Sequence, residues 1–282
     1  MRAFVTFADK SWRKAMSRIL HEAAALQFYD RLYGLNEAML DPTFRAKYDK
    51  HLVPKSRGFG YWCWKPQIIL QVLENLDKGD VLQYTDAGCH LNPAGKWRLS
   101  EYFDMARNNR QGVVAFQANP PSPPLAALPC EPLDLRDYRW AKGDLLDYLK
   151  VRETPSIFQT QTIGAGIIFV RKCSSAVDLI KEWASVIDAG FHLLDDTPSK
   201  NPNLPGFKEH RHDQAIFSLL CKKRGIDTIS AYEYWYPSAN GITPDWHALR
   251  NYPIHAKRDN GFLKRSKLKV GRLIRRLRGR TV

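Results

Sequence analysis

The chain has 282 residues, of which 44% are hydrophobic, 26% are charged and 12% are aromatic. This composition is that of an ordinary globular protein, and it excludes extended disorder and collagen-like or other fibrous repeats. The formal net charge of +14 is the unusual value. An excess of this size indicates an anionic partner such as nucleic acid, a phospholipid surface or a phosphorylated substrate.

The excess positive charge lies mostly at the C-terminal end. Residues 261–282 contain nine lysines and arginines and no acidic residue, which leaves a net charge of +5 for residues 1–260. The apolar residues of 270–277 recur at the spacing i, i+3, i+4, i+7, with arginines between them. We therefore expect one domain over 1–260 and a basic amphipathic C-terminal tail over 261–282 that binds an anionic membrane surface. The alternative for the tail is a solvated, disordered segment.

Several common features are missing from the sequence. The five cysteines are scattered without a Cys-x-x-Cys pair, so the sequence predicts neither a zinc site nor a disulfide framework. The first apolar run is too short for a signal peptide, and no stretch approaches the roughly 20 apolar residues of a membrane-spanning helix. We expect a cytoplasmic protein, which the tail could hold at the inner face of the cell membrane.

Strand and helix patterns alternate along the first part of the chain, which is typical of an α/β protein with a mostly parallel central sheet. Asp9 or Ser11 can cap the first helix, and Pro66 stands in the first turn of the second. The expected elements are strand 3–7, a helix ending near 25, strand 26–29, helix 66–76, strand 80–84, helix 96–107 and strand 112–117.

The second part of the chain is less regular. Residues 119–132 contain six prolines and must form a loop. The apolar segment 162–171 is a core strand, and its glycines permit close approach of a ligand or of another part of the backbone. The other expected elements are helix 141–151, helix 174–189, polar loop 195–210, helix 212–224, strand 225–229 and strand 252–256.

Four short segments carry the residues suited to chemistry. In open α/β sheets ligands bind beyond the carboxyl ends of the strands, where Asp9 and Asp86 stand in this sequence. An acid at a strand end can hold a cation, and a neighbouring glycine lets a phosphate or sugar approach. The alternative for Asp86 is a turn acid that caps the next segment.

The second segment, 57–66, has four aromatic residues and two glycines directly before a helix, with Lys65 at the helix start. A helix N-terminus with a lysine suits a phosphate, and the aromatic rings can form the wall of a sugar or base site. The alternative is a structural aromatic corner with Lys65 in solvent. The third segment places Asp213 and Gln214 at a helix start, where they could grip sugar hydroxyls or only cap the helix.

The fourth segment contains His255 followed by Lys257 and Arg258. A single histidine is more often structural than a ligand, but the basic pair beside it suits a diphosphate. Taken in order, the four segments resemble GT-A glycosyltransferases of bacterial surface-polysaccharide assembly (capsule and lipopolysaccharide). They also resemble, more distantly, the glycogenin-like and lipooligosaccharide galactosyltransferase-like group. The resemblance extends over about 1–260, and residues 58–69, 83–92 and 211–220 carry most of it.

The resemblance implies a single Rossmann-like nucleotide-diphospho-sugar transferase domain and a set of binding residues. Thr6, Phe7 and Asp9 would border the nucleotide. Lys65 would lie near the diphosphate, as would Lys257.

The resemblance also implies a divalent cation, Mn²⁺ or Mg²⁺, that bridges the diphosphate. Asp86 would match the first acid of the family's Asp-x-Asp motif, and His255 the late metal-ligating histidine. Gly88 stands where the second acid would be, beside the donor. With Gly88 in that place metal affinity should be weak, and Lys65, Lys257 and Arg258 could neutralise the diphosphate instead.

Asp213 and Gln214 would line the pocket of the donor sugar and the acceptor. An inverting reaction would need Asp213 as the base on the acceptor hydroxyl, whereas a retaining reaction could use the leaving phosphate and leave Asp213 to position the sugar. The expected partners are a nucleotide-sugar donor, a saccharide or lipid-linked acceptor and an anionic membrane, with no nucleic acid.

Two other functions fit parts of the sequence. A nucleic-acid-binding or scaffolding α/β protein with a basic arm would bind RNA in a salt-sensitive manner without needing Asp86 or Asp213. A nucleotidyltransferase would carry a glycine-rich phosphate loop after the first strand, and residues 7–14 contain no glycine.

Overall fold

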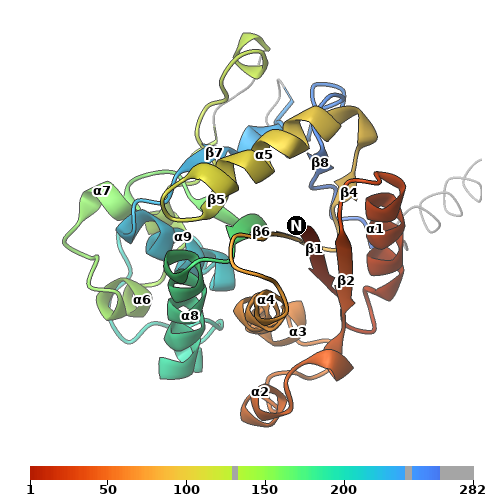
Figure 1. The fold of residues 1–282 in the computed structure, drawn as a ribbon. Helices are drawn as coiled ribbons and strands as arrows, with labels where there is room; N and C mark the ends of the chain where they lie inside the picture. The colour runs from red at the N-terminus through yellow and green to blue at the C-terminus, as the bar shows by residue number, and fades with distance from the viewer. Residues whose placement is uncertain (129–132, 239–242, 261–282) are drawn as a thin grey trace, which may run out of the picture.

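The structure is a computed structural model of the chain, and it describes residues 1–128, 133–238 and 243–260. The predicted basic tail at 261–282 lies outside the described residues. The architecture is a central β-sheet with helices on both faces (Figure 1).

The sheet has six strands in the order β2-β1-β3-β6-β5-β7. β1 pairs in parallel with β2 and β3, and β5 pairs in parallel with β7, whereas β6 runs antiparallel to both of its neighbours, β3 and β5. The predicted α/β class with a mostly parallel sheet is therefore confirmed. The strands are β1 (Arg2–Phe7), β2 (Arg31–Leu35), β3 (Val81–Thr85), β5 (Val113–Gln117), β6 (Ile163–Arg171) and β7 (Thr228–Ser230).

Two layers of helices cover the sheet. α1 and α5 pack on one face with Phe4 and Phe169, and α4, α8 and α9 pack on the other with Val5 and Ile168. Successive strand residues point to opposite faces, so both faces of a central strand must be apolar. The helices are α1 (Arg13–Ala25), α2 (Pro42–Lys47), α3 (Gly58–Tyr61), α4 (Trp64–Glu74), α5 (Lys96–Asn108), α6 (Gly143–Tyr148), α7 (Pro155–Phe158), α8 (Ser174–Ala189) and α9 (His212–Lys223).

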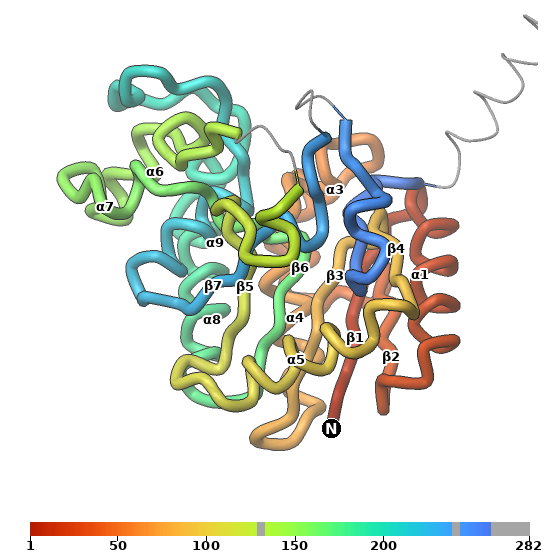
Figure 2. Tube along the Cα trace, turned by 90° about the horizontal axis from the view of Figure 1, so that it is seen from above, coloured from red at the N-terminus to blue at the C-terminus, as the bar shows by residue number. Residues whose placement is uncertain are grey.

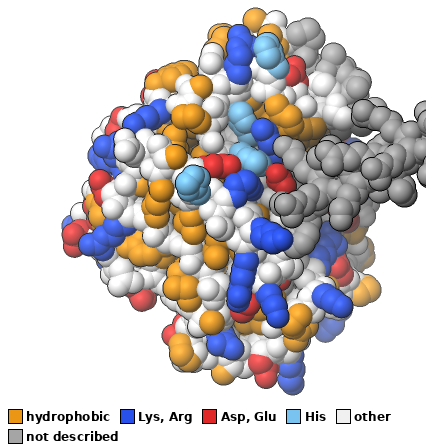
Figure 3. Space-filling model, turned by 90° about the vertical axis from the view of Figure 1, so that its right-hand side faces the viewer, with side chains coloured by type: hydrophobic (Ala, Val, Ile, Leu, Met, Phe, Trp, Pro, Cys, Tyr) orange, Lys and Arg blue, Asp and Glu red, His pale blue; other side chains and the backbone are white. Residues whose placement is uncertain are grey.

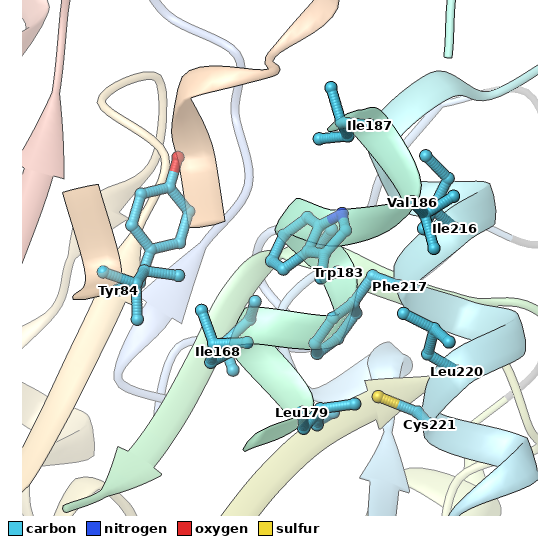
Figure 4. Packing of buried hydrophobic residues seen from close by; sticks show 14 of the residues in the cluster. Tyr84, Ile168, Leu179, Trp183, Val186, Ile187, Ile216, Phe217, Leu220 and Cys221 are labelled. Carbon is cyan, nitrogen blue, oxygen red and sulfur yellow. The ribbon is translucent and has the colours of Figure 1, made fainter. Parts of the chain in front are cut away.

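The larger core cluster lies between the sheet, α8 and α9. Trp183 of α8 and Phe217 of α9 have ring centroids 4.8 Å apart, and both side chains are completely buried (Figure 4). Aromatic pairs at this distance add to the free energy gained from burial of their area. This packing holds α9, and with it the predicted site residues at its start, firmly against β6.

Two details of the first strands and helix differ from the prediction. The second strand is Arg31–Leu35 rather than 26–29. Leu26 and Phe28 are apolar because they pack into the core from the turn after α1, where Gln27 has a φ of 47°. Neither Asp9 nor Ser11 caps α1, since the Ser11 hydroxyl donates to Asp9 Oδ1 at 2.7 Å instead.

The last described segment returns to the edge of the sheet where β1 and β3 end. Its strand β8 (Ile254–His255) pairs antiparallel with β4 (His90–Leu91), which follows β3 along the chain. Seen from above, β1 runs from the N-terminus toward the side of the molecule where α3 lies (Figure 2). Residues from the start, middle and end of the chain therefore meet at one edge.

Basic side chains gather on the face of the molecule that α1 forms, with some acidic and histidine side chains among them (Figure 3). Lys10, Arg13 and Lys14 are exposed at the start of this helix. Arg13 pairs with Glu37 at 2.9 Å. Within the described ranges, no helix combines the length and the apolar character that crossing a bilayer requires.

Candidate functional site

The carboxyl ends of β1 and β3 and the start of β6 lie at the same edge of the sheet, because β6 runs antiparallel to β3. Asp86 follows β3 directly, and its backbone N–H donates to Gly166 O of β6 at 2.8 Å. The first turn of α9 also reaches this edge, where Gln214 Nε2 donates to Thr162 Oγ1 at 3.3 Å. Asp86 and the Asp213–Gln214 pair are thus brought together.

Lys65 joins the two carboxylates. Its Nζ lies 2.6 Å from Asp213 Oδ2 and 3.4 Å from Asp86 Oδ1. The side chains of Lys65 and Asp213 are only 3% and 7% exposed, whereas that of Asp86 is 42% exposed. The three charges form a row that begins in the protein interior and ends at an accessible carboxylate.

Burial and charge act on the row in opposite directions. Burial raises the pKa of Asp213 to about 6, although the Lys65 ammonium opposes this shift. For Lys65 burial favours the neutral amine, but the charges of Asp213 and Asp86 outweigh it and the pKa of Lys65 is raised. Lys65 therefore stays protonated at neutral pH, whereas Asp213 gains or loses its proton at a pH of about 6.

The segment before Lys65 has an unusual backbone. All five residues from Gly58 to Trp62 have positive φ, and three of them, Phe59, Tyr61 and Trp62, are aromatic. Non-glycine residues in this left-handed region cost free energy, and such strain is concentrated at functional sites. The bond from Trp64 Nε1 to Gly58 O at 3.0 Å ties this turn to α4.

Asp86 is held in one orientation. Tyr84 OH donates to Asp86 Oδ1 at 2.5 Å. On the other side, Asp86 Oδ2 would lie only 2.9 Å from a Cβ placed on Gly166, so a side chain there would displace the carboxylate. The glycine in the predicted core strand thus permits the close approach that the sequence indicated, and the group that approaches is Asp86.

Gly88 is closed against a side chain. A Cβ at Gly88 would lie 3.1 Å from Arg258 Cα and 3.1 Å from Trp12 Cζ3, and Asp259 N donates to Gly88 O at 3.0 Å. Arg18 holds the same loop by donating to Ala87 O at 3.0 Å and Asp259 O at 3.1 Å. A side chain at 88 would therefore need small shifts of Arg258 and Trp12, which lie directly against this position.

His255 lies on β8 opposite His90. Its Nε2 is 2.8 Å from Leu249 O, and burial lowers its pKa. The parts of the chain that the structure describes contain no group of three or more His, Cys, Asp or Glu side chains that could hold a metal. The assignment of Asp86 and His255 as metal ligands stays a prediction. The described residues around Asp86 do not suit a metal ion, because the Lys65 ammonium already lies beside this carboxylate.

The other predicted nucleotide-site residues lie at or near this edge. The side chains of Thr6 and Phe7 are buried, so only their backbone could face a ligand. Phe7 stacks on Trp64 with ring centroids 4.0 Å apart. Asp9 is partly exposed, and Lys257 Nζ lies 5.4 Å from the ring of Trp246. The roles of all four residues stay predictions.

Three residues of the site were not singled out from the sequence. His212 has a φ of 49°, donates from Nδ1 to Leu194 O at 2.8 Å, and lies against Tyr61 with ring centroids 5.0 Å apart. Tyr234 OH lies over β6, 2.5 Å from where a Cβ of Gly164 would be. The guanidinium of Arg211 lies 3.7 Å above the ring of Trp140. The polar run at 209–214 contains His212 and Arg211, and no sequence pattern indicated Tyr234.

The sequence matches no protein-family model and no curated protein. The fold is similar to several solved structures at low identity. A glycosyltransferase involved in glycosylation of the major capsid of PBCV-1 is 11% identical, with 90% of this chain and 91% of that chain covered and a TM-score of 0.45. The apo form of mouse xyloside xylosyltransferase 1 is 10% identical, with 83% and 87% covered and a TM-score of 0.43.

The galactosyltransferase LgtC, in complex with donor and acceptor sugar analogs, is 12% identical, with 90% of this chain and 86% of that chain covered and a TM-score of 0.44. All three structures are glycosyltransferases, the class that the sequence resemblance named. At these identities the likeness concerns the fold, and the substrates of the three proteins are their own.

Proposed function

We propose that this chain is a glycosyltransferase that moves a sugar from a nucleoside diphosphate sugar to an acceptor hydroxyl. The observation that carries the proposal is the row Asp86, Lys65 and Asp213 at the carboxyl edge of the sheet. Ligands of open α/β sheets bind at this edge. A row of charges with one accessible end and one buried end suits a polar, partly anionic substrate better than a structural ion pair, which needs no accessible carboxylate.

Sugar transfer breaks the bond between the anomeric carbon and the phosphate oxygen and forms a bond from that carbon to the acceptor oxygen. The electron pair of the broken bond goes to the diphosphate, so cations near it stabilise the transition state. Lys65 is a fixed cation at the site. Gln214, held by Thr162, supplies an amide that can bind a sugar hydroxyl.

The acceptor proton has two possible destinations. In an inverting reaction Asp213 takes it as a general base, and its pKa of about 6 is close to the range in which a base works best at neutral pH. In a retaining reaction the leaving phosphate takes it, and Asp213 only positions Lys65 and the sugar. The anomeric configuration of the product decides between the two roles.

The proposed setting is the synthesis of bacterial cell-surface polysaccharide or lipopolysaccharide in the cytoplasm, with a saccharide or lipid-linked acceptor. This setting rests on the sequence resemblance and on the basic composition of 261–282. The proposed membrane contact is tested by flotation of the full chain and of a 1–260 truncation with liposomes of anionic lipid. Equal flotation of the two would remove the tail from the proposal.

The activity is tested with a panel of nucleotide sugars and a hydrolysis readout, with and without Mn²⁺ or Mg²⁺. We expect one donor to be hydrolysed slowly and the Asp86→Ala variant to lose this hydrolysis. If no donor binds or turns over, and the variant keeps every measurable property, the enzymatic proposal is wrong. Salt-sensitive RNA binding that survives loss of Asp86 and Asp213 would instead favour the nucleic-acid-binding alternative.

A further inference from the structure

We propose that the diphosphate of the donor is bound by the side chains of Arg211 and Arg258, near the fixed positive charge of Lys65, and that the reaction needs no divalent metal. This inference rests on the proposed function for the class of donor. It concerns how the site carries the negative charge, and it can be wrong while the proposed function is right.

The first argument is that a cation already lies beside Asp86. Asp86 Oδ1 receives the Tyr84 hydroxyl at 2.5 Å and faces Lys65 Nζ at 3.4 Å. A divalent ion on this oxygen would meet the ammonium at short range, and burial makes that repulsion stronger than it would be in water. The side chain of Lys65 is 3% exposed and tied to Asp213, so it has no open direction in which to retreat.

The second argument is that the chain closes the place of a second carboxylate. Hard divalent cations need several oxygen ligands. The first atom of a side chain at Gly88 would lie 3.1 Å from Arg258 Cα, a contact so tight that the Arg258 backbone would have to shift slightly. The residue that lies against Gly88 is a basic one, Arg258.

The third argument comes from two guanidinium groups that lack a carboxylate. Within the described part of the chain neither Arg211 nor Arg258 forms an ion pair. Arg211 is partly buried on the Trp140 ring, and this burial lowers its pKa. The Glu209 carboxylate opposes the shift, and repulsion from Arg258 adds to it. Two guanidinium groups that repel one another are costly unless an anion binds them, and planar guanidinium groups match phosphate oxygens.

Both arginines stand close to the row of charges. Arg258 Cα lies 3.1 Å from where a Cβ of Gly88 would be, two residues after Asp86, and Arg211 stands two residues before Asp213. Arg258 has a φ of 51° and is held in this conformation by the neighbouring bond from Asp259 N to Gly88 O at 3.0 Å. Strained residues held by their surroundings are typical of ligand clamps. Arg258 is therefore held against the loop that follows Asp86.

In the reaction these cations act on the leaving group. As the bond between the anomeric carbon and the phosphate oxygen breaks, its electron pair adds negative charge to the diphosphate. The two arginines can bind these oxygens, and the buried charge of Lys65 can attract them, without any change in the protonation of the three groups. The acceptor proton goes to Asp213 or to the leaving phosphate, as described above.

The test uses the full chain freed of metal by chelation. We expect turnover of the donor found in the nucleotide-sugar panel to change less than about twofold between chelator and added Mn²⁺ or Mg²⁺. Arg211→Ala and Arg258→Ala should each weaken binding of the matching nucleoside diphosphate, measured by calorimetry in chelator, by more than about tenfold, in line with charge-assisted bonds. Arg211→Lys and Arg258→Lys should retain part of the affinity.

Lys208→Ala is the matched control, because Lys208 is exposed and its Nζ lies 5.5 Å from the ring of the same Trp140. This variant should bind the nucleoside diphosphate as the unchanged protein does. Thermal unfolding of every variant separates loss of binding from loss of folding, and the two lysine variants serve if an alanine variant does not fold.

Turnover that chelator abolishes and metal restores would overturn this inference and leave the proposed function intact. If no sugar nucleotide turns over under any condition, the proposed function fails, and binding of UDP, GDP, CDP and ADP in chelator still decides the inference. Binding that the two arginine variants lose would uphold the cationic site, and no binding of any of the four would overturn it.

Discussion

Lys65 and Asp213 form a buried ion pair, with 2.6 Å between Nζ and Oδ2, although 148 positions separate them in the sequence. The pair joins the start of α4 to the start of α9, and so fixes two helices that pack against the same face of the sheet. A buried pair of this kind is costly to break, because the remaining charge is left without a partner. Substitution of either partner should therefore lower both stability and activity, and the ratio of the two losses should depend on which partner is substituted.

Asp213→Asn should lower turnover strongly, and it should also cost stability because it leaves the buried Lys65 ammonium with Asp86 alone. The amide keeps the shape of the side chain but carries no charge for Lys65 and accepts no proton, so we expect kcat to fall by roughly 100-fold to 10,000-fold, the range for loss of acid–base catalysis. Steady-state kinetics with the donor of the panel measure this. An unchanged kcat would remove Asp213 from both of its proposed roles.

Lys65→Met should destabilise the fold, because it leaves the buried Asp213 carboxylate without its cation and with Asp86 as a charged neighbour. We expect the free energy of unfolding to fall by roughly 3–5 kcal/mol, as for other broken buried pairs. Denaturant unfolding measures it. The loss should shrink in the double variant Lys65→Met with Asp213→Leu, which removes both charges together; an equal or larger loss there would contradict the pairing.

Turnover should fall as the pH drops through about 6. The pKa of Asp213 is raised to about 6 by burial, and both of its proposed roles need the ionised carboxylate. The same shift makes the folded chain bind this proton more tightly than the unfolded chain, so the contribution of Asp213 to stability decreases as pH rises from about 4 to about 6. A pH profile of kcat/KM checks the first effect, and Asp213→Asn should lack it.

Gly166→Ala should disturb the site more than the fold. The added Cβ would lie 2.9 Å from Asp86 Oδ2, and the carboxylate must move away. We expect turnover to fall at least about tenfold, with a loss of stability of about 1–3 kcal/mol typical of overpacking. Gly79→Ala is the control, because it strains a residue with φ of 93° but meets no atom within 4 Å. It should lower the Tm and leave turnover per folded molecule unchanged.

Substitution of Arg98 should lower the stability of the fold and leave the candidate site unchanged. Its Nη2 lies 2.7 Å from Glu233 Oε1, and Tyr102 OH donates to Glu233 at 2.5 Å, which ties α5 to the segment after β7. Arg98→Ala leaves this largely buried carboxylate without its main partner, so we expect a loss of roughly 3 kcal/mol. Arg107→Ala, which breaks the exposed pair with Asp104, should change stability by less than about 1 kcal/mol. Denaturant unfolding of both variants tests the contrast.

The sequence by itself determined the kind of fold and supplied several of the candidate site residues. Apolar runs predicted the core strands, because a strand covered on both faces must be apolar throughout. Asp86 at a strand end and Asp213 at a helix start followed from the same local patterns. Local patterns failed at residues 26–29, where apolar side chains serve a buried turn instead of a strand.

Only the tertiary structure decided which of these residues meet. It placed Lys65 between Asp86 and Asp213 and set the backbone of Arg258 against Gly88. Neither contact can be read from spacing, since each joins segments that are far apart in the chain. Periodicity reports which side chains are buried, but strand order, register and helix packing decide what they are buried against.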